Sequence, residues 1–422
     1  MGRWTLVALV INAIVGSGIF GLPNAVAGLV GAAAPLAYLL AAAGIGVIMA
    51  CFAEVASQFR EAGGPYLYAR AAFGRFAGIQ MGWLAFLVRL ASAAANANLF
   101  VIYLAEFWPE AKQPWPRAVV LTLLIGVLAA VNLRGVRSGA RVSNFFTVAK
   151  LVPLVTLVIA GLIFLRGRSP VGWVDVGGNA WLQAILILVF AYGGFESSMM
   201  PLSEARDPKR DAPFALLVSL GICTALFTTI HLVVMGALPD PTISDRPLAE
   251  TARVFLGAGG AWFIAVGALV SVYGYLSGQM LSAPRLPYAL AEQGDFPAAF
   301  ARVHDRYRTP YISILVYSLL VWGLAIYGSF LWNAVLSAVA RMFTYGMVCA
   351  AVIVLRRKQP GAAEFRLPVA WVFVALGLAF CIVLVTRMGR GELIVVVTTG
   401  LLALANWLWA RGKEDRSGGP SY

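Results

Sequence analysis

The sequence has few charged residues, few histidines and few cysteines. Only 12% of its 422 residues are charged and 60% are hydrophobic, whereas soluble domains are about 25% charged. The two histidines and four dispersed cysteines show no recognisable ligand spacing, so no metal site is expected. The cysteines all fall inside apolar segments, which argues against a disulfide framework; they are Cys51, Cys223, Cys349 and Cys381. The low charge and the high hydrophobic content indicate an integral membrane protein.

Motifs of several enzyme and channel classes are absent as well. The sequence contains no nucleophile and base constellation, no HExxH and no Walker loop GxxxxGK[ST]. It also lacks a TVGYG-like filter and a ring of charges that could line a channel. An enzyme is therefore not expected, nor any cofactor, and the absence of large loops argues against ATP-driven transport. A channel or receptor of the same fold is the remote alternative.

What the sequence does have is long uncharged runs. The first, from Trp4 to Ala53, holds 50 residues without a formal charge, and one membrane-spanning helix needs about 20. It starts near the N-terminus without a small-residue cleavage site, which indicates a retained span and not a secretory signal. Turn and charge signals divide the runs into twelve predicted helical spans, at 4–27, 33–57, 76–106, 117–133, 143–165, 180–203, 213–238, 254–282, 310–328, 330–355, 368–387 and 392–410.

Basic residues are distributed unequally between the two sets of loops. With twelve spans, one set and the termini hold 21 lysines and arginines, and the other set holds 8. The positive-inside rule therefore predicts that both termini are cytoplasmic. The net charge of +13 is explained by this asymmetry and by anionic lipid at the inner leaflet, so no nucleic acid partner is expected.

Two predicted spans carry glycines at their centres. The first contains INAIVGSGIFGL at 11–22 and the sixth contains FAYGGFESS at 190–198. Paired glycine-interrupted spans at matching positions of two halves indicate a transporter of inverted repeats, with its substrate between the breaks. Unpaired backbone at membrane depth must line a cavity or meet a ligand, and an amino acid zwitterion offers groups for both amides and carbonyls. The alternative is that the small residues only allow close helix packing.

These stretches resemble the amino acid–polyamine–organocation superfamily of transporters. The motifs that carry the resemblance are IVGSGIFGLP at 14–23, AEVASQFREAGGPYLYARAAFG at 53–74, FAYGGFESSMMPLSEARDPKRDAP at 190–213 and PRLPYALAEQGDFP at 284–297. The family implies an all-α, LeuT-like five-plus-five inverted repeat with broken helices 1 and 6 and two extra C-terminal helices. The organisation this implies is a first repeat at 1–165, a second at 180–355, the extra helices at 368–410 and a short cytoplasmic tail at 411–422.

The resemblance also implies a substrate site at the two breaks. Amides of Ser17 and Gly18 would bind the α-carboxylate, and carbonyls near Ala191 and Gly193 would bind the α-amine. Phe190 would be an aromatic gate, and Tyr273 aligns with a pocket-wall aromatic, although packing is the alternative for it. The predicted substrate-site residues are Ile14, Val15, Gly16, Ser17, Gly18, Phe190, Ala191, Gly193, Gly194, Phe195 and Tyr273.

Lys150 is an ionisable residue within predicted span five, and intramembrane charges are functional candidates by default. The resemblance strengthens this case, because several proton-coupled or sodium-independent members of the family carry a lysine here; it implies that the ammonium group takes the place of the sodium ion of sodium-coupled relatives and bridges spans one and eight. Ser271 and Ser277 are candidate partners in span eight. Because desolvation favours the neutral amine, the lysine could release a proton during transport. The alternative is a permanently charged lysine that staples span one.

Other buried charges have predicted structural or gating roles. Glu196 follows the second break and could gate or pair with a buried arginine. Arg89 and Arg341 are expected to brace helices through backbone carbonyls; the alternative is an arginine that faces the pocket and favours an acidic substrate. Charges at helix ends, Glu54 and Glu204 with Arg206, are predicted parts of an inner gate. His231 is interpreted as a hydrogen-bonded core residue.

The predicted function is secondary active transport of amino acids across the inner, cytoplasmic membrane by alternating access. Neutral amino acids are favoured because the expected pocket is apolar, with protons or counter-exchange as the coupling. The alternative is an amino acid or polyamine exchanger with a non-titrating lysine. The lipid bilayer and the substrate are the expected partners of a monomer or dimer, and a disulfide-linked accessory subunit is not expected because no external cysteine exists.

Overall fold

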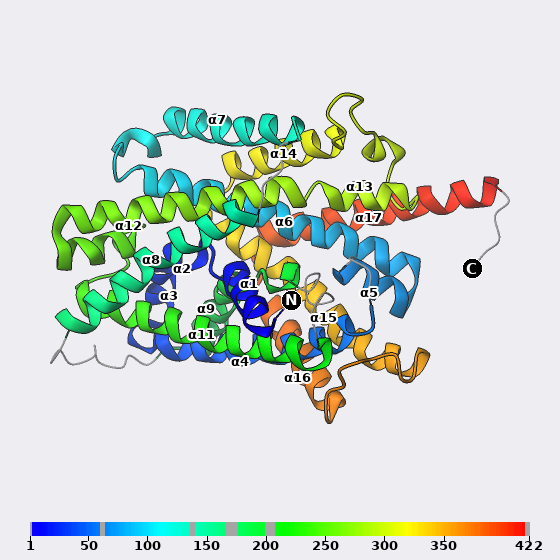
Figure 1. Ribbon diagram of the computed structural model, residues 1–422, viewed down its shortest axis with the longest axis horizontal. Coiled ribbons are helices and arrows are strands. Elements are labelled where there is room, and N and C mark those ends of the chain that lie inside the picture. The colour runs from blue at the N-terminus through cyan, green and yellow to red at the C-terminus, as the bar shows by residue number, and fades with distance from the viewer. Residues whose placement is uncertain (1, 60–63, 136–139, 166–175, 199–206, 418–422) are drawn as a thin grey trace.

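The computed structural model describes residues 2–59, 64–135, 140–165, 176–198 and 207–417, where every regular element is a helix (Figure 1). The first half contains α1 (Arg3–Ile14), α2 (Gly18–Gly21), α3 (Pro23–Val30), η1 (Gly31–Ala33), α4 (Ala34–Ala56), α5 (Gly64–Phe73), α6 (Arg75–Leu104), η2 (Pro109–Lys112), α7 (Pro114–Leu133) and α8 (Ala140–Phe164). The second half contains α9 (Gly178–Tyr192), η3 (Phe195–Ser198), α11 (Pro208–Ala237), α12 (Pro247–Ser282), α13 (Arg285–Glu292), η4 (Ala298–Ala301), α14 (Tyr311–Tyr327), α15 (Phe330–Lys358), α16 (Ala370–Val385) and α17 (Arg390–Ser417).

The helices are long and apolar enough for a multi-pass membrane protein. In the described part of the chain nine helical stretches could cross a membrane, and three shorter apolar helices lie at Ala149–Phe164, Tyr311–Tyr327 and Ala370–Val385. Large apolar side chains such as Leu123 and Val127 of α7 are exposed, as expected for surfaces that face lipid tails. The protein is therefore all-helical and membrane-spanning, and the count of twelve spans stays a prediction.

Helix α6 runs through the middle of the helix assembly and is the most buried of the long apolar helices (Figure 1). It packs against α5, α12, α14, α15 and α17. Its central turns are rich in alanine, and Ala93, Ala94, Ala95 and Ala97 are fully buried. Small side chains allow helices to approach closely where the hydrophobic effect does not drive association, which explains why this helix can contact so many neighbours.

Helices α1, α4, α9 and α11 form a second packed group. Helix α1 lies against α11, and α4 contacts both α9 and α11. The Ser219 hydroxyl of α11 donates to the carbonyl of Val7 in α1 at 3.0 Å, and the Tyr192 hydroxyl of α9 donates to the carbonyl of Tyr38 in α4 at 3.1 Å. Side-chain hydroxyls therefore join members of this group inside the bilayer.

Most predicted helix boundaries agree with the described helices to within about three residues. The larger differences are at the start of span seven, where α11 begins at Pro208 and not at 213, at the start of span eight, and at the end of span twelve, where α17 continues to Ser417 into the predicted tail at 411–422. The boundary predicted between 27 and 33 lies at Gly31, whose φ of +50° turns the chain from α3 into α4. Predicted span eight starts at 254, but α12 begins at Pro247 and contains a kink at Gly257, where φ is +67°. A charge signal at Arg253 placed the boundary too late, because Arg253 pairs with Glu250 and is tolerated within the helix.

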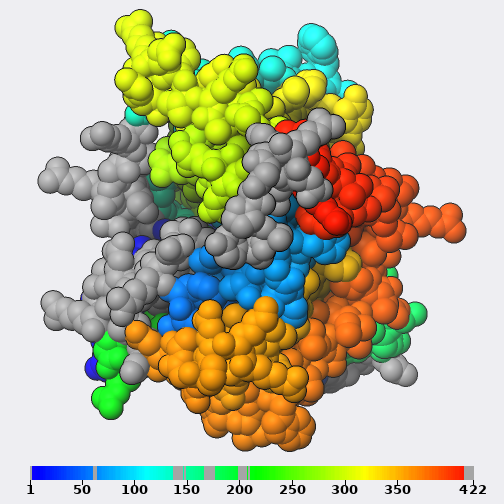
Figure 2. Space-filling model, turned by 90° about the vertical axis from the view of Figure 1, so that its right-hand side faces the viewer, coloured from blue at the N-terminus to red at the C-terminus, as the bar shows by residue number. Residues whose placement is uncertain are grey.

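One end of the molecule gathers the termini of several helices. Figure 2 shows α5 and the start of α6 between the α13 segment and the connection from α15 to α16, with α17 alongside. Four of the segments that meet here, α5, the start of α6, the segment directly after α13, and α17, are joined by a polar network described below.

Candidate functional site

The first predicted break is present in the structure. Helix α1 ends at Ile14, Val15 is extended with φ −71° and ψ 93°, and the chain becomes helical again at Gly18. The first amide of the new turn to donate within it is that of Phe20, which bonds to the Ser17 carbonyl at 3.1 Å. The amides of Ser17 and Gly18 therefore lie before the first amide that donates a hydrogen bond within this turn.

Ser17 has an unsatisfied polar group at this break. Its side chain is only 2% exposed, and its hydroxyl has no hydrogen-bond partner among the described residues. An unpaired hydroxyl in an apolar environment is unfavourable. The first break therefore presents a buried donor and acceptor that a ligand could satisfy.

The second predicted break is present as well. Helix α9 ends at Tyr192, Gly193 is extended, and Gly194 has a φ of +107° before the short turn η3 begins. The Gly193 amide donates to the Phe190 carbonyl at 3.3 Å. The rest of predicted span six, from 199 to 203, lies outside the described residues.

The two breaks are in direct contact. A Cβ added at Gly18 would lie 2.7 Å from the Cα of Ala191, and one at Gly194 would collide with the carbonyl oxygen of Ala13. Both glycines therefore allow two backbones to approach closely. The glycines interrupt the helices and also permit close helix packing, so both interpretations of the small residues apply. The structure brings Gly18 against Ala191 and Gly194 against Ala13.

Phe190 and Phe330 form an aromatic pair beside the breaks. Their ring centroids are 6.2 Å apart at 82°, and the Phe330 ring would lie 2.5 Å from a Cβ at Gly21. Phe330 also lines a cavity of about 340 Å³, together with Val101, Ile102 and Tyr327. Phe330 therefore contacts both the cavity and, through Phe190 and Gly21, the helices of the two breaks. Phe330 was not predicted, because a phenylalanine at the start of an apolar helix carries no distinctive signal.

Lys150 of α8 reaches the open end of α1. Its ammonium group donates to the carbonyl oxygens of Asn12 and Val15, both at 2.6 Å, and the residue is 7% exposed. These carbonyls belong to the end of α1, where backbone acceptors lack helical partners. Among the described residues, no hydrogen bond joins Lys150 to Ser271 or Ser277, so the predicted bridge to span eight is not observed.

Glu196 accepts three hydrogen bonds. The donors are the Gly194 amide at 2.8 Å, the Arg341 guanidinium at 3.0 Å and the Tyr345 hydroxyl at 3.0 Å. Arg341 pairs with Glu196 and donates to the Ser337 hydroxyl at 3.3 Å. The predicted bracing of Arg341 through backbone carbonyls is therefore wrong, and the predicted alternative for Glu196, a pair with a buried arginine, is confirmed. A guanidinium matches a carboxylate better than isolated carbonyls do. The carboxylate nearest the second break is therefore neutralised.

Two predicted pocket aromatics lie in packing positions. Phe195 is fully buried, with ring centroids 5.3 Å from Phe52 and 5.4 Å from Tyr345. Tyr273 is 38% exposed and its ring lies 6.1 Å from that of Phe146 on α8. The packing alternative therefore describes Tyr273 better than a pocket wall does.

Glu54 at the end of α4 is fully buried and paired. It accepts from the Arg356 guanidinium at 2.5 and 2.7 Å and from the Leu367 amide at 2.8 Å. The bidentate pair joins α4 to α15 and to the chain before α16. The other predicted gate residues, Glu204 and Arg206, lie outside the described residues.

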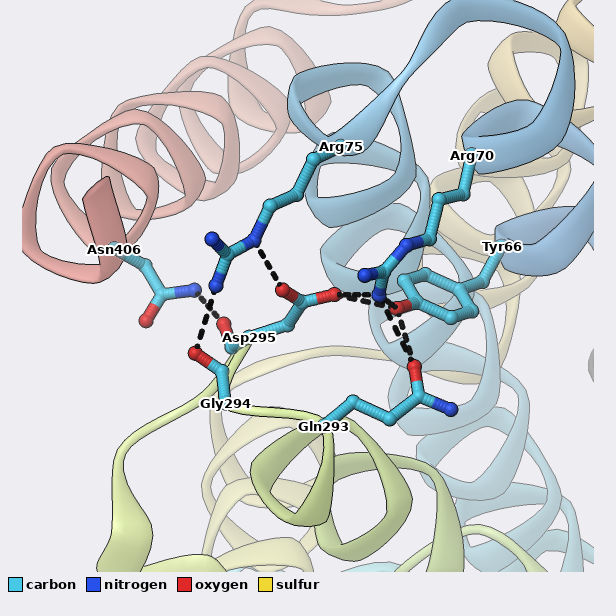
Figure 3. A network of polar contacts seen from close by, with 7 residues as sticks. All are labelled: Tyr66, Arg70, Arg75, Gln293, Gly294, Asp295 and Asn406. Atoms are coloured by element: carbon cyan, nitrogen blue, oxygen red, sulfur yellow. Dashed lines mark hydrogen bonds and ion pairs between the residues drawn. The ribbon is translucent and has the colours of Figure 1, made fainter. Parts of the chain in front are cut away.

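A network that sequence reasoning missed is centred on Asp295 (Figure 3). The fully buried carboxylate accepts from Arg70 at 2.6 Å, Arg75 at 2.6 Å and the Tyr66 hydroxyl at 2.5 Å. Asn406 of α17 donates to the Asp295 carbonyl at 2.6 Å. Burial and the hydrogen bond to Asp295 raise the pKa of Tyr66. This Asp295 network ties α5, α6 and α17 to the segment after α13. Tyr66 and Arg70 belong to the quoted motif at 53–74, and Asp295 belongs to the quoted motif at 284–297.

Comparisons with known proteins cover nearly the whole chain. Residues 1–402 match a family model described as amino acid permease. A methylthioribose transporter of Bacillus subtilis (strain 168) is 24% identical over 399 residues, which cover 90% of this chain and 87% of the relative. A branched-chain amino acid permease of the same strain is 24% identical over 418 residues, or 92% and 88% of the two chains. An uncharacterised transporter of Mycobacterium tuberculosis (strain ATCC 25618 / H37Rv) is 31% identical over 421 residues, or 90% and 86%.

Proposed function

The chain belongs to the amino acid permease family, and we propose that it is a secondary transporter of neutral amino acids that works by alternating access. Members of this family are transporters and not enzymes. The observation that carries the proposal is the contact between two interrupted helices, at Gly18 and Ala191, beside the unpartnered hydroxyl of Ser17. Interrupted helices with unpaired polar groups are typical of a transport site at the membrane midplane.

The backbone of the substrate would be recognised by both breaks. The amides of Ser17 and Gly18 and the Ser17 hydroxyl would bind an α-carboxylate, because free amides at a helix start favour anions. Carbonyls at the end of α9, at Ala191 and Gly193, would bind an α-ammonium group. A zwitterion fits this arrangement better than an ion of one sign.

A neutral side chain is favoured by the state of Glu196. Its carboxylate is paired with Arg341 and hydrogen-bonded to Tyr345, so it is not free to bind a cationic substrate. Around the first break Ile14 and Val15 are buried apolar residues. The relation to a branched-chain amino acid permease supports the same substrate class, while the similar relation to a methylthioribose transporter makes that compound a necessary comparison.

Lys150 would act as a fixed positive charge at the end of α1. Its two hydrogen bonds to Asn12 and Val15 satisfy carbonyls that would otherwise need a cation or water. This supports stapling, and hence transport that needs no sodium ion. Counter-exchange with such a non-titrating lysine is the second mode of operation that the geometry allows.

The proposed cycle moves one helix group against another. In the LeuT-like arrangement of two five-helix repeats, at 1–165 and 180–355, the group of α1, α4, α9 and α11 would move against α6, α12 and α14. Phe190 with Phe330 would close the outer side, and Glu54 with Arg356 would close the inner side. Both termini would be cytoplasmic, as the distribution of basic residues predicts.

Thermal stabilisation by ligands tests the proposal. The purified protein would be heated with each standard amino acid and with methylthioribose, since a ligand that binds the folded state raises the melting temperature. Neutral amino acids with apolar side chains should stabilise it most, and this effect should be lost in the Gly18→Leu variant, whose side chain would fill the contact with Ala191. Stabilisation only by cationic compounds, or by methylthioribose alone, would reject the proposed substrate class.

A further inference from the structure

His231 on α11 is a fully buried histidine without a hydrogen-bond partner among the described residues. Its side chain is 0% exposed, and both Nδ1 and Nε2 are unpaired. The prediction that it is a hydrogen-bonded core residue is therefore wrong. A neutral imidazole has one N–H donor and one acceptor nitrogen, and unpaired polar groups in an apolar interior are rare and call for an explanation.

Two neighbouring hydroxyls share this property. The Tyr38 ring of α4 lies 5.3 Å from the His231 ring, and the Tyr38 hydroxyl is buried and unpaired among the described residues. Thr228 lies on the same face of α11 three residues earlier, and its hydroxyl is also buried and unpaired there. His231, Tyr38 and Thr228 form the His231 cluster, in which unpartnered atoms from two helices are concentrated.

The His231 cluster is connected to the second break. Tyr192 donates its hydroxyl to the carbonyl of Tyr38 at 3.1 Å, and Tyr192 is the last residue of α9, next to Gly193. A change in backbone position at the break would therefore be transmitted to α4 and to the cluster.

Other buried ionisable groups near the breaks have partners already. Lys150 donates to two carbonyls of α1, and Glu196 accepts from three donors, including Arg341. Glu54 is held by Arg356 and the Leu367 amide. Glu196 and Glu54 would lose an ion pair with an arginine on protonation, and Lys150 would lose the positive charge of its donor to two carbonyls on deprotonation, whereas His231 has no such partner among the described residues.

We propose that the imidazole of His231 is the proton-binding group of the transport cycle. This inference rests on the proposed transport function and adds the coupling ion and its site. In the step, a lone pair on one unpartnered ring nitrogen forms an N–H bond with a proton delivered by water from one side of the membrane. The same bond breaks to release the proton to water on the other side, and no electron transfer is involved.

The charges around His231 decide which protonation state of the imidazole is favoured. The titratable neighbours are Tyr38 on α4 and Tyr192 on α9, which carry no charge at neutral pH. On α8, Lys150 faces Cys223, which is eight residues or about 12 Å along α11 from His231.

Among the described residues, the remaining elements that pack against α11 add no charge at this place. Helix α3 contains no charged residue, Arg3 of α1 lies over Phe214 near the opposite end of α11, and Glu250 and Arg253 of α12 pair with each other. A charge without a partner in an apolar site is unfavourable, so the neutral imidazole is favoured in this conformation. A conformation that admits water to His231 would favour the cation, and protonation would in turn favour that conformation.

Transport assays in proteoliposomes test this inference. The variants are His231→Asn and His231→Gln, which retain a polar side chain but do not titrate, and the matched control is His304→Asn, the other histidine of the chain, in a loop. Amino acid accumulation driven by a pH gradient should fall about tenfold or more in both His231 variants, as expected when the linkage between proton and conformation is lost. Counterflow without a gradient should stay within about twofold of the wild type, since exchange needs no net proton movement.

The same assays separate the possible failures. Gradient-driven accumulation by the His231 variants at the wild-type level would overturn the inference. So would a wild type that shows counterflow but no response to the gradient, although the proposed function would then stand. If neither His231 variant folds, Tyr38→Phe removes one unpaired hydroxyl of the cluster and should shift the pH dependence of uptake; an unchanged profile would contradict the proposal. A wild type that transports no amino acid would reject the proposed function itself.

Discussion

Gly18 and Ala191 are in backbone contact across the two interrupted helices, with room for no side chain at Gly18. An added Cβ would lie 2.7 Å from the Ala191 Cα and 2.9 Å from its Cβ. The contact places the first turn after one break against the last turn before the other. A change in one break therefore cannot occur without a response in the other.

Replacing Gly18 by alanine should strongly reduce transport. The methyl group must push α2 away from α9, because the neighbouring atoms are backbone and cannot rotate away. Uptake should fall by more than about tenfold, since misplacing binding groups by about 1 Å is costly. The control is Gly126→Ala on α7, where no atom lies within 4 Å of the added Cβ; equal activities of the two variants would contradict the role of the contact.

Removing the positive charge of Arg341 should change substrate preference. In Arg341→Gln the buried Glu196 carboxylate loses its ionic partner, so lysine and arginine should begin to compete with neutral amino acids. The variant should also lose about 3–5 kcal/mol of stability, as expected when one partner of a buried pair is removed. Competition uptake and thermal unfolding measure both effects. Arg341→Lys keeps the charge and should retain the neutral preference; lysine competition in that control too would argue against the explanation.

Lys150 and His231 should have separable effects. Because the Lys150 ammonium satisfies the carbonyls of Asn12 and Val15, Lys150→Met should distort α1 and reduce counterflow and gradient-driven accumulation together. His231→Asn should reduce accumulation alone. Parallel assays of both variants in sodium-free buffer give the comparison. Normal counterflow in Lys150→Met would show that the lysine does not staple the first span and would favour a titrating role.

Asp295 should contribute to stability more than an exposed carboxylate does. Asp295→Asn leaves Arg70 and Arg75 without the buried carboxylate that both contact, and a loss of about 3–5 kcal/mol is expected. Asp207→Asn is the matched control, because its pair with Arg210 is exposed and 4.0 Å long, a class worth at most about 1 kcal/mol. Thermal unfolding of both variants gives the comparison; similar melting temperatures would contradict the structural importance of the network.

The sequence predicted local features of this protein better than its long-range pairs. Uncharged runs located the helices, and the glycines near positions 16 and 193 located both interruptions, because each signal depends on a few neighbouring residues. The sequence predicted that Glu196 could pair with a buried arginine but could not select Arg341, which is 145 residues away and which only the packing of α15 against α9 brings close. Arg356 could not be identified as the partner of Glu54 for the same reason, because the two residues are 302 positions apart in the sequence.

Side-chain direction limited the prediction in other places. Tyr273 was expected at the substrate site, but the rotation of α12 about its axis places it beside Phe146 at an exposed surface. His231 was expected to have a hydrogen-bond partner, and none of the described residues supplies one. Uniformly apolar helices carry little periodic signal about which face is buried, so these orientations require the three-dimensional structure.

Counterflow of a labelled branched-chain amino acid tests the central claim most directly. Proteoliposomes loaded with unlabelled amino acid would be diluted into labelled amino acid without sodium and without a pH gradient. The account predicts saturable accumulation of label that neutral amino acids inhibit and that lysine, glutamate and methylthioribose do not. Absence of counterflow with every standard amino acid, or inhibition by methylthioribose alone, would contradict it.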